Sequence, residues 1–186
     1  MIAESENGVR IGNFAHSPLG NLLTDAWLES FPEADFAISN LGGLRQPIRA
    51  GKITLGDVIG VLPFDNTLYM VSISGQDLKD ELTNNYPVVG GMKYVWQTLQ
   101  NGNRKIQKIF DRNGKEILDN SKYKVVTTNF LYLGGDNFKF KEKDTAPQKT
   151  GINWRDPLIA KIRKIKDQSK YIDFIPDVRA IEAQEY

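Results

Sequence analysis

Residues 38–45, Ile-Ser-Asn-Leu-Gly-Gly-Leu-Arg, join the end of an apolar run to a glycine pair and an arginine. The apolar run, Phe36-Ala37-Ile38, has the composition of a buried strand. The glycine pair permits a sharp turn in which the backbone can approach a ligand closely. Because binding residues concentrate on loops held by a rigid scaffold, Asn40 and Arg45 are candidates for holding a polar small molecule. A glycine-rich turn with a surface arginine is the alternative interpretation.

Two later loops have the same character, with a phenylalanine set among turn residues. Pro63-Phe64-Asp65-Asn66 places one ring in a polar turn. The segment 129–136, Asn-Phe-Leu-Tyr-Leu-Gly-Gly-Asp, places a second ring, Phe130, six residues before an acid and near a glycine pair. The polar neighbours argue against deep burial of either ring. The alternative is that both phenylalanines belong to the hydrophobic core.

In order and spacing, these three loops resemble those of the C-terminal, substrate-recognition domain of 5'-nucleotidases, the family that includes ecto-5'-nucleotidase and the periplasmic UDP-sugar hydrolases. The resemblance runs from Leu19-Gly20-Asn21-Leu22 through Asp136 and continues more weakly to a helix after Asp156. It implies an α+β fold, a mixed α/β architecture of layered helices and mixed sheets. Residues 1–186 are expected to form one domain of this type, with 170–186 as a possible extended tail.

The resemblance implies a role for each loop. Phe64 and Phe130 match rings that stack on the two faces of a nucleobase. Asp136 matches a carboxylate that accepts hydrogen bonds from the ribose hydroxyls, with capping of its own turn as the alternative. Asn40 matches a polar contact to the base, and Arg45 a contact to phosphate, with a surface ion pair as the alternative. The expected substrate-binding set is Asn40, Gly42, Gly43, Arg45, Phe64, Asn66, Phe130, Gly135 and Asp136.

One departure from the family pattern concerns phosphate. Members that resemble ecto-5'-nucleotidase place a second phosphate arginine a few residues before the Leu-Gly-Asn, and the equivalent position here is at or near Ala15. His16 is a weak substitute because a neutral imidazole binds phosphate poorly. The ligand is therefore expected to be a nucleoside or a nucleotide, with a different phosphate compound or another small molecule as alternatives.

The residue content argues against catalysis by this chain alone. A two-metal phosphatase centre needs several His, Asp and Asn ligands around ions about 4 Å apart, and this chain has one histidine, His16. No nucleophile-elbow sequence supports a Ser-His-acid triad. The resemblance implies no catalytic residue, metal ligand or cofactor here. It implies a divalent metal pair in a metallophosphoesterase catalytic domain, in the same precursor or a separate chain.

The expected function is therefore substrate recognition: a nucleoside- or nucleotide-binding specificity domain of a 5'-nucleotidase-type phosphohydrolase. The alternative is a non-catalytic binding or assembly module that retains the fold. Hydrolysis of sugar nucleotides or cyclic nucleotides, as in the wider superfamily, also stays open.

Composition narrows the partners and the location. The chain has 186 residues, a formal net charge of +1 and no cysteine. Nucleic acid and membrane are not expected as partners, and no stretch approaches the roughly 20 apolar residues that span a bilayer. The absence of cysteine excludes disulfides and thiolate metal sites. The opening Met1-Ile2-Ala3-Glu4 is no signal sequence, and the resemblance implies a periplasmic or extracellular location.

Local patterns predict the elements along the chain. Ser17 is expected to cap a helix whose apolar stripe includes Leu19 and Trp27, with Gly20 serving close packing or ligand approach. Capping boxes at 54–57 and 74–77 open two further helices. Strands are expected at 36–38, 67–73, 92–96, 106–110 and 123–128, with hairpin turns at Asn101-Gly102 and Asn113-Gly114. Residues 139–151 are expected to form a surface loop, and a last helix begins at Asp156.

Overall fold

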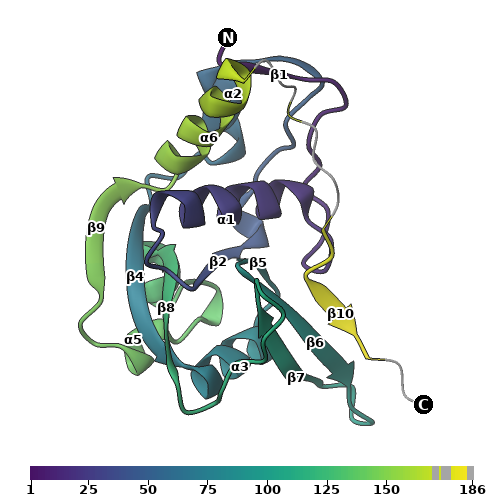
Figure 1. Ribbon diagram of the computed structural model, residues 1–186, viewed down its shortest axis with the longest axis vertical. Coiled ribbons are helices and arrows are strands. Elements are labelled where there is room, and N and C mark those ends of the chain that lie inside the picture. The colour runs from purple at the N-terminus through teal and green to yellow at the C-terminus, as the bar shows by residue number, and fades with distance from the viewer. Residues whose placement is uncertain (169–171, 173–176, 184–186) are drawn as a thin grey trace.

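The computed structural model describes residues 1–168, 172 and 177–183. Helices and strands are interspersed along the chain, as expected for a mixed fold (Figure 1). In chain order they are β1 (Ala3–Ser5), α1 (Pro18–Ser30), β2 (Phe36–Asn40), the 3-10 turn η1 (Leu41–Gly43), β3 (Gly51–Ile53), α2 (Leu55–Val61), β4 (Thr67–Ser74), α3 (Gly75–Asn84), β5 (Pro87–Gly90), β6 (Met92–Thr98), β7 (Arg104–Asp111), β8 (Lys122–Thr128), α4 (Asn129–Tyr132), the 3-10 turn η2 (Gly135–Asn137), α5 (Phe140–Lys143), β9 (Gln148–Asn153), α6 (Asp156–Asp167) and β10 (Ala180–Glu182).

A five-stranded sheet in the order β5-β2-β8-β4-β9 forms the centre of the fold. Its strands β2 and β8 are parallel, whereas β5, β4 and β9 pair antiparallel with their neighbours. A second sheet has the order β10-β6-β7, and β1 pairs with β3 in a small two-stranded sheet. Both larger sheets therefore mix parallel and antiparallel pairs.

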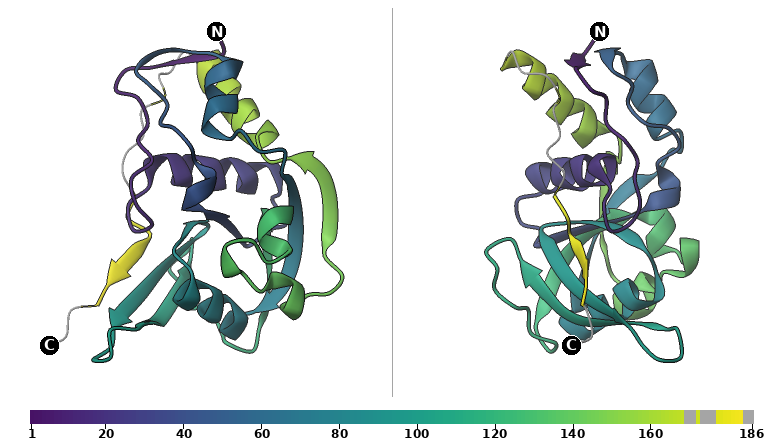
Figure 2. Two further views of the ribbon diagram at one scale, coloured as in Figure 1. Left: turned by 180° about the vertical axis from the view of Figure 1, so that it is seen from behind. Right: turned by 90° about the vertical axis from the view of Figure 1, so that its right-hand side faces the viewer.

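Side chains alternate between the two faces of the central sheet, and each face builds its own hydrophobic core. Ala37 and Met70 point into the core formed with α1, α2 and α6, whereas Ile38 and Val71 point into the core formed with α3, β6 and β7. Figures 1 and 2 show α1 and α6 on one side of the sheet and α3 with the β6–β7 hairpin on the other. The predicted α+β fold of layered helices and mixed sheets is confirmed.

Helix α1 begins where its sequence predicts. Ser17 Oγ accepts a hydrogen bond from the Gly20 N–H at 3.1 Å, and Pro18 occupies the first turn. Gly20 serves close packing, because a Cβ there would lie 2.5 Å from Val88 Cγ1 on β5. The helix ends at Ser30, and Phe31 is its C-cap, directly before Pro32, which cannot continue a helix.

Both predicted capping boxes are confirmed. At the start of α2, the Thr54 N–H donates to Asp57 Oδ2 at 2.7 Å. At the start of α3, the Ser74 N–H donates to Asp77 Oδ2 at 3.1 Å. Burial raises the pKa of Asp77, but the hydrogen bonds from Ser74 and Lys143 outweigh it and leave the pKa lowered.

The structure corrects two expectations of the sequence. The segment 139–151 is not a loop throughout, because it contains α5 and most of β9. At Gly90-Gly91 the chain passes from β5 in the central sheet to β6 in the second sheet. The end of the chain, for which the sequence predicts no element, contributes strand β10, which pairs parallel to β6. β10 is short and pairs with a strand that is distant in the sequence, so it leaves no periodic pattern that could be recognised.

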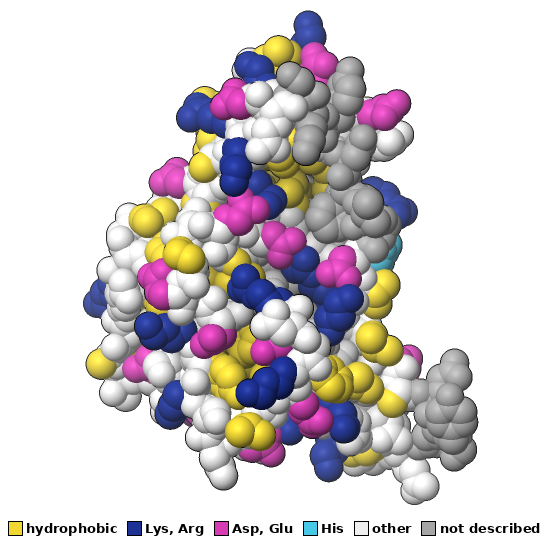
Figure 3. All heavy atoms as spheres, viewed as in Figure 1, with side chains coloured by type: hydrophobic (Ala, Val, Ile, Leu, Met, Phe, Trp, Pro, Cys, Tyr) yellow, Lys and Arg dark blue, Asp and Glu magenta, His cyan; other side chains and the backbone are white. Residues whose placement is uncertain are grey.

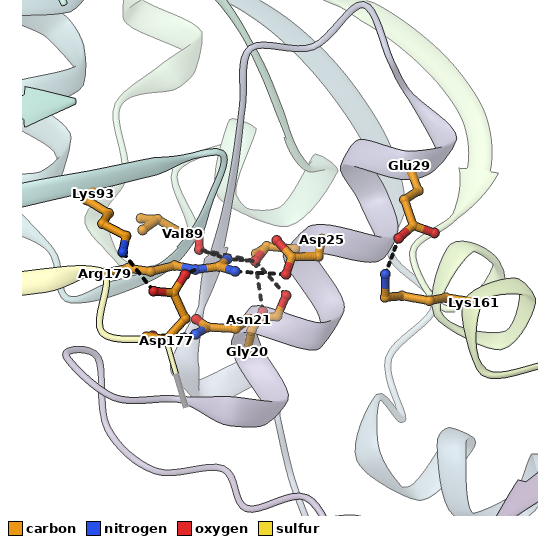
Figure 4. A network of polar contacts seen from close by, with 10 residues as sticks. Gly20, Asn21, Asp25, Glu29, Val89, Lys93, Lys161, Asp177 and Arg179 are labelled. Atoms are coloured by element: carbon orange, nitrogen blue, oxygen red, sulfur yellow. Dashed lines mark hydrogen bonds and ion pairs between the residues drawn. The ribbon is translucent and has the colours of Figure 1, made fainter. Parts of the chain in front are cut away.

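The segment that leads into β10 is tied to α1 by buried charges (Figure 4). Arg179 donates to Asp25 Oδ2 and to the Val89 carbonyl, both at 2.7 Å. Asp177 accepts from Lys93 Nζ at 2.9 Å, and its carbonyl accepts from Asn21 Nδ2 at 2.7 Å. The predicted tail 170–186 is described only in part, since 170, 171, 173–176 and 184–186 lie outside the described residues.

Within the described ranges, no helix combines the length and apolar character needed to cross a bilayer. On the face shown in Figure 3, Lys and Arg side chains are interspersed with Asp and Glu.

Candidate functional site

Four loops meet at one end of the central sheet because of its strand directions. β2 and β8 are parallel neighbours, so the segments that follow them, 41–45 and 129–137, leave from the same end. β4 is antiparallel to β8 and pairs Leu68 with Thr128, so the preceding loop 63–66 lies at that end too. β9 pairs Asn153 with Thr67, which brings Trp154 and Arg155 there. The three loops singled out in the sequence are therefore neighbours in space.

Both predicted stacking rings lie at the surface. Phe64 is 47% exposed and Phe130 is 42% exposed, which excludes the alternative that they are core residues. Among the described residues neither ring stacks on the other; Phe64 lies beneath Arg45, and Phe130 lies against Gly135. Exposed aromatic rings held at a loop junction are available for stacking on a flat ligand.

Asp136 and Asn40 meet across the sheet end. Asn40 Nδ2 donates to Asp136 Oδ2 at 2.7 Å. The carboxylate therefore contacts another loop rather than capping its own turn, and its other oxygen stays available as an acceptor. Gly43 makes room for this pair, because a Cβ there would lie 2.9 Å from Asn40 Oδ1. Gly42 faces the same two side chains: a Cβ there would lie 3.8 Å from Asn40 Nδ2 and 4.0 Å from Asp136 Oδ2.

Arg45 contributes a guanidinium without a carboxylate partner among the described residues. Its Nη1 donates to the Gly42 carbonyl at 3.0 Å, and its Cζ lies 5.9 Å from the centre of the Phe64 ring. The alternative of a surface ion pair is thus not what the structure contains. An unneutralised guanidinium beside a ring is suited to an anionic group on an aromatic ligand.

Two residues that the sequence prediction did not single out hold the Phe64 loop. Trp154 is fully buried, and its Nε1 donates to the Phe64 carbonyl at 2.7 Å. Arg155 Nη1 donates to the Leu62 carbonyl at 3.0 Å, and Nη2 pairs with Asp65. Asn66, a predicted ligand contact, accepts from the Trp154 N–H through its carbonyl at 3.1 Å. The available signal in the sequence was the pair Trp154-Arg155 directly after strand β9. The sequence prediction misses it because it places residues 139–151 in a loop, so no strand is expected to end there.

The Phe130 loop is held from two sides. Asn129 Oδ1 accepts from the Thr67 N–H at 3.0 Å, which joins this loop to the start of β4. Beyond Asp136, the Lys139 N–H donates to Glu81 Oε1 at 3.0 Å. Glu81 is only 3% exposed, and burial raises its pKa to about 7. No sequence pattern pointed to Glu81. Its position on α3 has no feature that distinguishes it from other polar residues on a partly buried helix face.

The start of α1 lies at the same end of the sheet, because Gly20 packs on Val88 near the start of β5. The N–H groups of Ala15 and His16 donate to Asn13 Oδ1 at 3.0 and 2.9 Å. The residues that depart from the family pattern are thus in a tight turn before α1, where Phe14 packs against Tyr86 and Trp96.

The donor set of the described residues does not fit a metal pair. Among residues 1–168, 172 and 177–183, no three His, Cys, Asp or Glu side chains converge as a metal site would require. The predicted binding loops offer one carboxylate, Asp136, and it already bonds to Asn40.

A separate groove of about 990 Å³ lies at the opposite end of the central sheet, between α1, α6 and the β6–β7–β10 sheet. Its lining includes Gly91 and Asp111, which are remote from the loops along the strands. Its lining charges are largely paired, with Arg179 against Asp25 and Lys161 against Glu29 (Figure 4). The groove therefore offers few free charges to a ligand.

The chain is similar to known proteins in sequence. A family model described as "5'-nucleotidase, C-terminal domain" matches residues 1–142. The trifunctional nucleotide phosphoesterase protein YfkN of Bacillus subtilis (strain 168) is 38% identical over 138 residues, which cover 64% of this chain and 9% of that protein. A 5'-nucleotidase of Vibrio parahaemolyticus is 33% identical over 169 residues, which cover 86% of this chain and 29% of that protein.

The fold is similar to a solved structure as well. The crystal structure of a 5'-nucleotidase precursor from Thermus thermophilus matches with a TM-score of 0.86 and 25% identity, over 100% of this chain and 40% of that one. The chain thus spans less than half the length of each of these relatives. The resemblance inferred from the three loops is confirmed: this chain belongs to the family of 5'-nucleotidase C-terminal domains.

Proposed function

We propose that the chain is the nucleoside- or nucleotide-binding specificity domain of a 5'-nucleotidase-type phosphohydrolase. The observation that carries the proposal is the meeting of two exposed phenylalanine rings, the Asn40–Asp136 pair and the unneutralised Arg45 at one sheet end. Together these supply apolar faces for a base, hydrogen-bonding groups for a sugar and a cation for phosphate.

In the proposed binding mode, the base stacks on Phe64 and Phe130, and the ribose hydroxyls donate to Asp136. A charged acceptor suits a vicinal diol, because a carboxylate has acceptor positions on both oxygens. Asn40 fixes the carboxylate and offers its own carbonyl to the ligand. Gly42, Gly43 and Gly135 keep the backbone free of side chains that would fill the space, and Asn66 contributes an amide.

The catalytic metals are proposed to lie outside this chain. The described residues lack a ligand set for a metal pair, and the matched region is 29% of the length of the Vibrio 5'-nucleotidase. We therefore assign the divalent metals to a metallophosphoesterase catalytic domain, in the same precursor or a partner chain. This chain holds base and ribose and presents the phosphate to that domain. A periplasmic or extracellular location is proposed from family membership.

The test is calorimetric titration of the protein with adenosine and with AMP. Phe64→Ala and Phe130→Ala are each expected to weaken adenosine binding by about 1–3 kcal/mol, roughly 5- to 150-fold, because each removes one stacking partner. AMP is expected to bind more tightly than adenosine, because Arg45 adds a charge-assisted contact.

The matched control is Leu118→Ala, which removes another exposed apolar side chain, 64% exposed and outside the four loops. It should leave both affinities unchanged. Adenosine binding that is unaffected by both phenylalanine substitutions would remove the stacking site from the proposal.

A second candidate function is that of a non-catalytic binding module. It is favoured by Ala15 standing where the family pattern has an arginine, which leaves Arg45 as the matched phosphate contact. This candidate function predicts that the protein binds AMP no more tightly than adenosine. It is contradicted if AMP binds at least several-fold more tightly and the gain disappears in Arg45→Gln.

A further inference from the structure

The loop that carries Asp136 has an unfavourable backbone conformation. φ is 51° at Asp136 and 65° at Asn137, directly after Gly134 and Gly135, of which Gly134 has a φ of 102°. Left-handed conformations are disfavoured for residues with a side chain, and two in succession are rarer still. Such a segment keeps its shape only where surrounding contacts hold it.

The backbone hydrogen bonds inside the loop are local, and its link to another loop is the side-chain bond between Asn40 and Asp136. The Gly134 N–H donates to the Leu131 carbonyl at 3.1 Å, and the Phe138 N–H donates to the Gly135 carbonyl at 3.2 Å. The next backbone donor is different, because the Lys139 N–H reaches Glu81 Oε1 on helix α3 at 3.0 Å. The strained segment is therefore fastened to another element at its exit.

Apolar packing covers the same exit. Phe138 and Phe140 are buried and stack with ring centres 5.3 Å apart and planes 12° apart. They belong to the core that also contains Leu78 and Leu82, the neighbours of Glu81 on α3. Displacing this part of the loop would admit water to the Glu81 carboxyl.

Glu81 itself lacks a neutralising partner among the described residues. Its second oxygen accepts from the neutral amide of Asn85, at 3.2 Å. Lys143 of α5, a neighbouring cation, pairs instead with Asp77 at 3.0 Å and with Asp80 at 4.0 Å. Arg104 of β7 donates to the carbonyls of Leu82 and Asn85 rather than to the carboxyl. Burial raises the pKa of Glu81 and outweighs the charges of Lys143 and Lys139, which lower it. A buried acid without a direct ion pair is costly when ionised, so its presence at the loop exit is unusual.

We propose that Glu81 is a positioning residue of the ligand site: it holds segment 134–139 closed through the Lys139 N–H, so that Asp136 stays against Asn40. This inference rests on the proposed function of the loop. It adds a residue from outside the four loops, which touches no ligand and acts through the backbone.

The protonation of Glu81 is coupled to the closed loop. Burial raises its pKa to about 7, against an ordinary value of 4.5 that solvation in an open loop would approach. The closed state therefore binds the proton more tightly than the open state. The resulting stabilisation of the closed loop is full below pH 4.5 and is lost as the pH rises through 7. Asp77 and Lys143 stay charged across this range, since the pKa of Asp77 is lowered and that of Lys143 is raised by Asp77.

The first test needs no ligand. Hydrogen exchange of the amides in 134–139 is measured at pH 5.5 and pH 8 and corrected for the intrinsic exchange rate, with the β8 amides as the reference for global opening. The loop of the wild-type protein should lose protection about tenfold or more at pH 8. Glu81→Gln, which keeps the size and one carbonyl acceptor, should abolish this pH dependence. Glu81→Leu should leave the loop poorly protected at both pH values.

The second test is adenosine affinity at pH 6 and pH 8, because adenosine itself does not titrate in this range. The wild-type protein should bind several-fold more tightly at pH 6, Glu81→Gln should bind equally at both, and Glu81→Leu should bind at least tenfold more weakly than the wild type. Glu116→Gln, which removes an exposed glutamate that pairs with Lys108, is the matched control and should behave as the wild type.

The outcomes separate the two proposals. If the wild type binds no adenosine but loop exchange depends on Glu81, the proposed function fails and the positioning role stands. If adenosine binds but loop exchange is independent of pH and unchanged in Glu81→Gln and Glu81→Leu, the positioning role is overturned and the proposed function stands. Should Glu81→Leu fail to fold, Glu81→Gln decides the matter by its pH profile.

Discussion

The ring of Phe130 occupies the space that a side chain at position 135 would need, and Gly135 has no side chain. A Cβ at this position would lie 2.4 Å from Cε1 and Cζ of Phe130. Real Cβ atoms do not approach a ring so closely, so the glycine fixes where Phe130 can lie. A residue with no side chain thereby determines the position of one of the two proposed stacking surfaces.

Gly135→Ala tests this dependence. The methyl group should push the Phe130 ring aside and weaken adenosine binding by about tenfold, within the range of losing one stacking partner. The free energy of unfolding should change by less than about 1 kcal/mol, because Phe130 is partly exposed and can rotate. Calorimetry and denaturant unfolding measure the two effects.

The control is Gly56→Ala on α2, where a Cβ would have only Thr54 Oγ1 nearby, at 3.5 Å. This variant should bind adenosine normally and be equally or slightly more stable, since alanine favours a helix over glycine by up to about 1 kcal/mol. Equal affinities for Gly135→Ala and Gly56→Ala would argue against a fixed position for Phe130.

At the scale of elements, the loops are held by strands that are distant in the sequence. Strand β9 ends beside the start of β4, and the residue that follows it, Trp154, places its ring against Gly43 and its Nε1 on the Phe64 carbonyl. One side chain therefore supports both the loop after β2 and the loop before β4. The edge strand β9 therefore supports the site, because it positions Trp154 against both loops.

Trp154→Phe should remove the hydrogen bond to the Phe64 carbonyl while keeping most of the apolar packing. It leaves the partly buried Phe64 carbonyl without its donor, which costs about 1–3 kcal/mol. The free energy of unfolding should fall by about that amount, and adenosine affinity should fall several-fold because the Phe64 ring becomes less well positioned. Chemical denaturation and calorimetry measure these changes.

Trp96→Phe is the matched control, because the Nε1 of Trp96 is buried without a hydrogen-bond partner among the described residues. Losing that donor should cost little stability and no affinity. A similar loss of affinity in both tryptophan variants would contradict a specific role for the Trp154 hydrogen bond.

At the scale of the whole molecule, two hydrophobic cores on the faces of one sheet account for the fold, and Glu81 is a charge placed inside one of them. In the folded protein its pKa is about 7, whereas the ordinary value is 4.5. The folded state therefore binds the proton more tightly than the unfolded chain. The stability that this contributes is fully present below pH 4.5 and is lost as the pH rises through 7.

Glu81→Gln should remove this dependence. Between pH 5 and pH 7.5 the wild-type protein should lose on the order of 2–3 kcal/mol of unfolding free energy relative to the variant, from the conversion of a pKa difference into free energy. Urea unfolding of both proteins at the two pH values measures the difference. Glu116→Gln should differ from the wild type by a constant amount, and a constant difference for Glu81→Gln as well would contradict a titrating buried carboxyl.

Much of the fold followed from short-range patterns. Ser17, Thr54 and Ser74 cap helices in the structure as their local sequences predict, because capping depends on residues within one helical turn. The strands of the β6–β7 hairpin and its Asn101-Gly102 turn were also predictable from alternation and turn chemistry. The elements missed are short or lie in charged segments, and the strands among them exist because another strand edge pairs with them; they are β1, β3, α4, β5, α5, β9 and β10.

The sequence by itself determined which residues are the candidates for contact with a ligand: the amide, guanidinium, carboxylate and rings of three loops, each flanked by glycine or polar residues. Only the tertiary structure decided how those residues are held. Trp154 and Glu81 support the loops through hydrogen bonds to backbone groups across separations of 90 and 58 residues. A backbone acceptor or donor has no identity in the sequence, so such contacts leave no pattern to be recognised until the chain is folded.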